Sequence, residues 1–176
     1  FTPVVIEQPE EPRQGYRSGR CDAYTTDASG LAGERTALKD PANNIILPEI
    51  ISKEPLGPVV RHGDNAWGDI VRWTHFVTLV AEEKGITQAN LAEVVAANGA
   101  DNAAADPETQ RMLGITGTLG EGMGLTNTWA QDVIKAVGNY AEIFDRNIGP
   151  KTNIGLERGL NALWNKGGLQ YAPPFN

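Results

Sequence analysis

Short runs of strand-forming residues alternate with helix-like segments over the first 62 residues of this chain. The runs are Val4 to Ile6, "CDAYTTD" (residues 21–27), "NIILPEI" (44–50) and "EPLGPVVR" (54–61). Such alternation predicts an α/β fold with a parallel or mixed sheet. After residue 62 the pattern is almost entirely helical, and four strands at most would leave those helices little sheet to cover. The shortage of strands predicts that part of the fold lies outside this chain.

Helical spacing of apolar residues and local start and stop signals predict six helices. The most strongly marked one begins after Asp64, a favoured N-cap residue, and ends at Gly85. A polar surface loop is expected at 99–108 and a flexible glycine-rich loop at 114–125, and two prolines near "ISKEPLGPVV" suggest a domain boundary. The expected helices cover residues 10–17, 29–39, 65–84, 87–99, 126–144 and 154–164.

Composition excludes several classes of protein. The chain has 176 residues and a formal net charge of -7, which opposes binding to a phosphate backbone. No apolar stretch approaches the roughly 20 residues that a membrane helix needs. The single cysteine, Cys21, has no partner for a disulfide within the chain. The opening "FTPVVIE" has neither an initiator Met nor a leader, which suggests a processed product or a fragment.

The sequence predicts no catalytic residue, no metal site and no cofactor. The glycines of "GITGTLGEGMGL" lack the preceding strand and the spacing of a phosphate loop. His62 and His75 lack a third metal ligand at sensible spacing. The acidic pairs at 10–11 and 82–83 point in different directions on a helix and are interpreted as solvated faces. The four tryptophans fall mostly on the apolar faces of expected helices and are interpreted as core residues.

Asp27 is the exception, because it stands where an expected strand ends and the chain turns into a helix. Open α/β sheets bind their ligands at this place. Aspartate is also a favoured N-cap, so Asp27 or Ser29 could simply start the helix. Position alone leaves both interpretations open.

Several segments resemble a known family. "GRCDAYTTD" resembles the "GRxDA", strand and "D" segment of type II periplasmic solute-binding proteins for amino acids, and "KEPLGPVVRHGDNAWGDIVRW" is similar to their return crossover. More narrowly, "LPEIISKEPLGPVVR", "GNYAEIFDRNIG" and "RGLNALWNKGGLQYAPPF" resemble the general L-amino acid (Aap/Bzt-type) branch of ABC-transporter binding proteins. The resemblance extends over the whole chain.

The resemblance implies a two-lobed protein of about twice this length, of which this chain is the C-terminal half. Residues 1–52 would be the later part of lobe two, residues 53–60 a hinge crossover strand, and residues 61–176 the C-terminal part of lobe one. Asp27 matches the aspartate that accepts the α-ammonium of the ligand. The partner of the α-carboxylate, the side-chain pocket and the secretion signal would all lie upstream. An L-amino acid and a membrane permease are the implied partners, and the periplasm is the implied location.

Two other functions stay open at this point. Dehydratases and lyases are built on similar two-lobed folds, but an enzyme would need a poised acid or base, and Asp27 is the sole candidate. Alternatively, the chain could be a self-associating fragment that uses uncovered lobe faces and binds no ligand.

Overall fold

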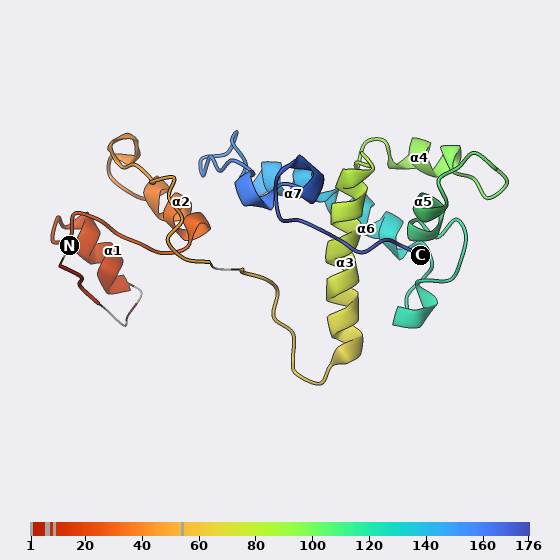
Figure 1. Ribbon diagram of the computed structural model, residues 1–176, viewed down its shortest axis with the longest axis horizontal. Coiled ribbons are helices and arrows are strands. Elements are labelled where there is room, and N and C mark those ends of the chain that lie inside the picture. The colour runs from red at the N-terminus through yellow and green to blue at the C-terminus, as the bar shows by residue number, and fades with distance from the viewer. Residues whose placement is uncertain (1, 6–7, 9, 54) are drawn as a thin grey trace.

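The computed structural model describes residues 2–5, 8, 10–53 and 55–176. Figure 1 shows a small helical unit near the N-terminus, joined by a long extended connection to the lower end of α3 in a larger helical unit. The small unit contains α1 (Glu10–Arg17), α2 (Ala28–Thr36) and a 3-10 turn (Pro41–Asn43). It has little core, since the only residues buried within its two α-helices are Gly15 and Ala32.

The larger unit is organised around α3 (Asn65–Glu83), which packs against α6 (Trp129–Val137) and α7 (Tyr140–Asn147). Its core includes the fully buried residues Val77, Leu113 and Ile134. None of the helices in the described ranges combines the length and the apolar character needed to cross a membrane. The remaining elements are α4 (Leu91–Ala97), α5 (Pro107–Met112) and the 3-10 turns Glu121–Met123, Gly159–Asn161 and Trp164–Lys166.

The helices with strong local signals form where the sequence predicts them. The prediction for α1 is confirmed at both ends. In α3 the Asp64 carboxylate accepts a hydrogen bond from the Trp67 backbone N–H at 3.1 Å, so the predicted cap is present. The helix ends at Glu83 with Lys84 as its C-cap, and Gly85 follows with a φ of 69°, which favours glycine. These signals act within one turn of the chain and therefore need no tertiary context.

The single helix expected over 126–144 is divided into α6 and α7. Gly138 has a φ of 79° and breaks the helix, and Asn139 then starts α7. The Asn139 side chain accepts from the Glu142 backbone N–H, and the Glu142 side chain accepts from the Asn139 N–H, both at 2.9 Å. This reciprocal capping box stabilises the break. The apolar residues keep helical spacing across the break at Gly138, so spacing alone predicts one continuous helix.

Four other expectations need correction. The helix over 154–164 is wrong, because the range holds one short 3-10 turn, Gly159–Asn161, and the start of another at Trp164, and Gly155 and Gly159 have positive φ. The fourth helix begins at Leu91 rather than at residue 87, after a turn at 88–90. The polar loop at 99–108 already contains the start of α5, capped by Asp106. Part of the glycine-rich segment packs closely, since a Cβ on Gly120 would lie 2.1 Å from the Thr126 carbonyl oxygen, whereas Gly122 and Gly124 have open space around them.

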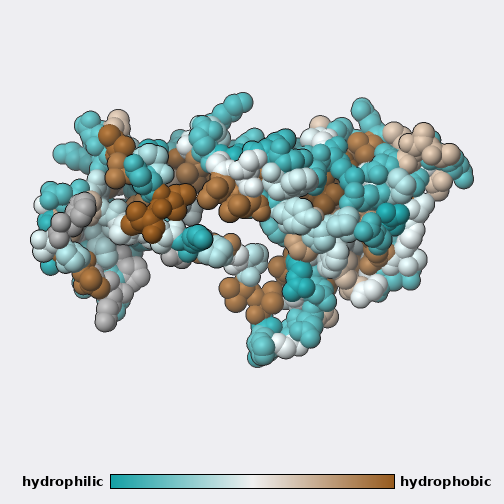
Figure 2. All heavy atoms as spheres, viewed as in Figure 1, coloured by the Kyte–Doolittle hydropathy of each residue, from teal (hydrophilic) through white to brown (hydrophobic). Residues whose placement is uncertain are grey.

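The expected strands do not form within the described residues, where the only bridge is an isolated one between Leu163 and Gln170. The strands of the predicted α/β fold are therefore absent from the described residues of this chain, and Ile6 and Glu54, which belong to two of the expected strands, lie outside those residues. A strand needs a neighbour for its backbone hydrogen bonds, and no described segment supplies one. The apolar side chains of the expected strands are therefore exposed, and Figure 2 shows apolar surface, in brown, over this part of the molecule. Exposed examples are Val5, Ile45, Leu47, Ile50, Ile51, Leu56 and Val59.

Candidate functional site

Asp27 stands at the start of α2 without capping it through its side chain. Its backbone carbonyl accepts the Leu31 N–H at 2.8 Å, so the main chain begins the helix there. Its carboxylate makes no capping hydrogen bond, and no ion pair to it occurs among the described residues. The residue is half-buried. The side-chain cap that competed with the ligand hypothesis is therefore not formed, and the carboxylate is available for another partner.

The position of α2 is fixed by ion pairs to α1. Glu34 in α2 meets the Arg13 Nε atom at 2.9 Å and an Arg17 terminal nitrogen at 3.1 Å. The Glu34 side chain is only 21% exposed, which limits solvent screening of these contacts. Arg13 also meets Glu10 at 2.7 Å. Two arginines from one helix thus hold the helix that carries Asp27.

Close packing fixes the segments on both sides of Asp27. A Cβ on Gly15 would lie 3.5 Å from the Cys21 sulfur, so α1 approaches the preceding segment closely. A Cβ on Gly30 would lie 3.2 Å from a methyl carbon of Thr26, next to Asp27. The Tyr16 hydroxyl donates to Asn44 and ties α1 to the chain beyond α2. Gly15 in α1 and Gly30 in α2 therefore let these helices lie against the segment that leads to Asp27.

The other candidate residues do not assemble into a site. The search of the described residues shows no group of His, Cys, Asp and Glu suited to a metal ion. His62 is exposed, whereas His75 is half-buried on α3 with its ring 5.8 Å from the Tyr140 ring. Burial lowers the pKa of His75 below its ordinary value. The two histidines thus lie in different surroundings, one exposed and one packed against an aromatic ring.

The interpretation of the acidic pair at 82–83 as a solvated face holds for Glu83, which is exposed, and needs correction for Glu82. The Glu82 side chain is 8% exposed and pairs with Arg158 at 3.0 Å. Glu83 accepts a hydrogen bond from the indole N–H of Trp164 at 3.3 Å. The expectation that the tryptophans are core residues is correct for Trp129 and fails for Trp67 and Trp164, which are 53% and 52% exposed.

Two surface hollows of the small unit do not include Asp27. One is lined by Arg35, Thr36, Asn44 and Ile45 and by Asn153 of the larger unit, among others. The other lies beside Tyr16, Leu38 and Asp40. Arg35 is eight residues beyond Asp27, so the helical rise puts the first hollow about 12 Å further along α2. Neither hollow is a binding pocket built around the predicted anchor.

Comparison with known proteins gives a consistent result. The chain is 57% identical over 175 residues to the glutamate/glutamine/aspartate/asparagine-binding protein BztA of Rhodobacter capsulatus, covering 99% of this chain and 50% of that protein. It is 56% identical over 176 residues to the general L-amino acid-binding periplasmic protein AapJ of Rhizobium johnstonii, with the same coverage. No model of a known protein family matches the chain.

The structural comparison identifies the class. An ABC transporter periplasmic binding protein from Brucella ovis, with glutathione bound, superposes with a TM-score of 0.87 and is 53% identical, over 100% of this chain and 53% of that one. The fold is therefore that of part of an ABC-transporter periplasmic binding protein. Within that class, the chain is a homologue of the amino-acid-binding periplasmic proteins, and it spans about half the length of the relatives it matches.

Proposed function

We propose that this chain is the C-terminal half of an amino-acid receptor of an ABC importer and that Asp27 anchors the α-ammonium of the ligand. The observation that carries the proposal is the half-buried Asp27 carboxylate at the start of α2, which makes no capping hydrogen bond. The resemblance of "GRCDAYTTD" to the ammonium-binding segment of such receptors supports the assignment. The receptor captures the amino acid between two lobes and delivers it to the permease.

The proposed chemistry follows from the charges of an amino acid. Its ammonium loses water when the lobes close, so it needs an anionic partner. Unit charges 4 Å apart attract by about 4 kcal/mol at an effective dielectric constant of about 20, enough for one carboxylate to serve as anchor. The partner of the ligand carboxylate belongs to the half of the protein that precedes this chain.

The names of the related proteins support recognition of the amino-acid head group rather than of one side chain. One relative is named for four acidic and amide amino acids, another for L-amino acids in general, and the structural neighbour holds glutathione. Glutathione carries a free α-ammonium and α-carboxylate on its glutamyl residue. A free α-amino-acid group is thus common to these ligands. Asp27 binds its α-ammonium, which is the same whatever the side chain.

The proposed division of the chain follows its sequence and exposure. Residues 1–52 belong to lobe two, residues 53–60 cross between the lobes, and residues 61–176 complete lobe one. The crossover is supported by Leu56 and Val59, which are 69% and 95% exposed, and residues 55–60 around them form neither helix nor turn. Such side chains are expected to be covered by neighbouring strands from the other half of the receptor. The receptor acts in the periplasm after removal of its signal peptide and docks on a membrane permease.

Two alternative functions have less support. The relatives are named as binding proteins, which gives no support to an enzyme on the same fold. Self-association of this chain through its exposed apolar segments is the remaining alternative. It predicts a dimer of the isolated 176 residues by size-exclusion chromatography, whereas a receptor half predicts recovery of binding when the other half is added.

Titration calorimetry of the complete protein against a panel of L-amino acids tests the proposal. We expect heat of binding for several L-amino acids and none for molecules that lack the α-ammonium, such as the matching α-keto acids. Asp27→Asn should weaken binding by about 2 to 5 kcal/mol, since the ammonium then loses its anionic partner. The matched control is Glu11→Gln, which removes one exposed charge from the same unit. Equal affinities of D27N and the parent protein would return Asp27 to a purely structural role.

A further inference from the structure

The segment 171–176, here called the tail, crosses the larger unit and places one aromatic ring in its core. Phe175 is 2% exposed, and its ring centroid lies 5.2 Å from that of Trp73 on α3 in an edge-on arrangement. Trp73 also meets Phe76 edge-on at 5.5 Å. Figure 1 shows the tail running across the front of α3 toward α5 and α6. The neighbours Tyr171 and Asn176 are exposed, so Phe175 is the anchor of the tail.

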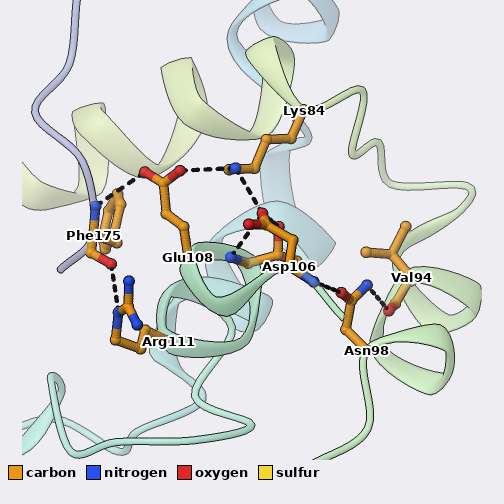
Figure 3. A network of polar contacts seen from close by, with 8 residues as sticks. Lys84, Val94, Asn98, Asp106, Glu108, Arg111 and Phe175 are labelled. Atoms are coloured by element: carbon orange, nitrogen blue, oxygen red, sulfur yellow. Dashed lines mark hydrogen bonds and ion pairs between the residues drawn. The ribbon is translucent and has the colours of Figure 1, made fainter. Parts of the chain in front are cut away.

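Both backbone groups of Phe175 are bound by side chains of α5. The Glu108 carboxylate accepts the Phe175 N–H at 3.1 Å, and the Arg111 Nε donates to the Phe175 carbonyl at 2.8 Å. Figure 3 shows the two contacts on opposite sides of the same residue. A donor and an acceptor spaced in this way satisfy an extended residue as a neighbouring strand would. The site therefore recognises main chain as well as an aromatic side chain.

The clamp residues are themselves held in place. Lys84, just beyond α3, binds Glu108 at 2.8 Å and Asp106 at 2.7 Å. Asp106 caps α5 by accepting the Thr109 backbone N–H at 3.1 Å. The Lys84 side chain is only 22% exposed, so these contacts are partly shielded from water. The orientation of Glu108 thus depends on contacts that do not involve the tail.

The tail packs on α3 at the boundary between the buried and the more exposed parts of the helix. Residues 77–81 are buried, whereas most of residues 65–72 are half-buried or exposed, and Trp67 is 53% exposed. Trp73 stands between these two parts of the helix. Pro173 and Pro174 precede the anchor and stiffen the chain, which reduces the entropy lost on docking.

We propose that the tail is a strap docked in a peptide-binding site between α3 and α5 and that it holds the first half of α3 in place. That half of α3 is continuous with the connection to the unit that carries Asp27. The site takes a short extended peptide with a phenylalanine, recognised through its ring and both of its backbone groups. Its usual occupant is the tail of the same chain.

Hydrogen exchange of the complete protein with and without residues 173–176 tests the strap. Removal of the strap should raise amide exchange in residues 68–76 by about tenfold or more. Without the strap, local opening of this part of α3 breaks fewer packing contacts and therefore costs less free energy. Residues 77–83 should change less. A synthetic peptide of residues 169–176 should bind the shortened protein saturably and restore slow exchange. The same peptide with a Phe175→Ala change should do neither, and the intact protein should not bind the added peptide.

A second variant keeps the test decisive if the shortened protein does not fold. Phe175→Ala in the complete protein leaves Pro173 and Pro174 in place, and Asn176→Ala is its control, since Asn176 is exposed. We expect faster exchange at residues 68–76 for F175A and no change for N176A. Unchanged exchange in F175A, or equal binding of the peptide to intact and shortened proteins, would overturn the proposal. Neither result depends on amino-acid binding at Asp27.

Discussion

Arg158 binds Glu82 across the larger unit although the two residues are 76 positions apart. The Arg158 Nη2 atom lies 3.1 and 3.0 Å from the two carboxylate oxygens of Glu82. The guanidinium also stands over the Tyr140 and Phe144 rings, 5.1 and 5.2 Å from their centroids. Its Nε and Nη2 atoms donate further to the Asn161 carbonyl. One arginine therefore joins α3, α7 and the irregular segment after residue 150.

Removing one member of this pair should destabilise the protein strongly. Glu82→Gln leaves the guanidinium of Arg158 partly buried without its counter-charge, which typically costs about 3 to 5 kcal/mol for a fully buried pair and somewhat less here. Urea unfolding of the complete protein measures the loss. Glu93→Gln, on the exposed side of α4, is the matched control and should change stability by less than about 0.5 kcal/mol. Equal effects of the two substitutions would contradict the role assigned to Arg158.

Asp106 should give the protein an acid-dependent component of stability. A hydrogen bond from Lys84, followed by one from Thr109, holds the pKa of Asp106 at about 2, below its ordinary value of 3.8. Because the pKa is lowered by folding, this stabilisation is complete above about pH 4 and is lost as pH falls toward 2. The side chain is 47% exposed, so solvent screening leaves a contribution of about 1 kcal/mol.

Asp106→Asn isolates the charge, since asparagine is an equally good N-cap. Urea unfolding should show the variant less stable than the parent at pH 6, and the difference should shrink steadily below pH 4. A difference that stays constant down to pH 2 would show that the charge of Asp106 contributes nothing.

His75 should destabilise the folded state at mildly acidic pH. Its burial against the Tyr140 ring lowers the folded-state pKa below 6.5, so folding favours the neutral imidazole. The stabilisation is present above pH 6.5 and is lost as pH falls through the folded-state pKa. NMR titration should place the His75 midpoint below 6.5. In His75→Gln, stability should fall less between pH 7 and pH 5 than in His62→Gln, and an identical pH response in both variants would contradict this.

Local signals predicted the helices well and failed where distant parts of the chain decide. The Asp64 cap and Gly85 bound α3 because each acts within one turn. The clamp on Phe175 joins residues 67 positions apart, and no spacing in the sequence indicates it. The break at Gly138 was predictable in principle, since "GNYAE" carries the asparagine and the glutamate of a capping box.

The site shows the same division between local and distant information. The turn from "CDAYTTD" into α2 placed Asp27 at a helix start, as the structure confirms. The strands around it were predicted from residue type, but strands form only when a neighbour completes their hydrogen bonds. Ile45 and Val59, which are 82% and 95% exposed, are examples of side chains that neighbouring strands would be expected to cover. The ligand role of Asp27 stays a prediction for the same reason, because half of the proposed cleft belongs to another part of the protein.

Two glycine substitutions should change stability in opposite directions. Gly138→Ala forces a Cβ to within 2.6 Å of a Glu142 carboxylate oxygen at a φ of 79°, so it should destabilise by about 1 to 3 kcal/mol and disrupt the capping box. Gly33→Ala meets nothing within 4 Å inside α2 and should stabilise by about 0.5 to 1 kcal/mol. Thermal unfolding of the complete protein measures both effects. Stabilisation by G138A would mean that α6 and α7 can join into the one long helix that the apolar spacing suggests, with Glu142 swinging clear of the added methyl group.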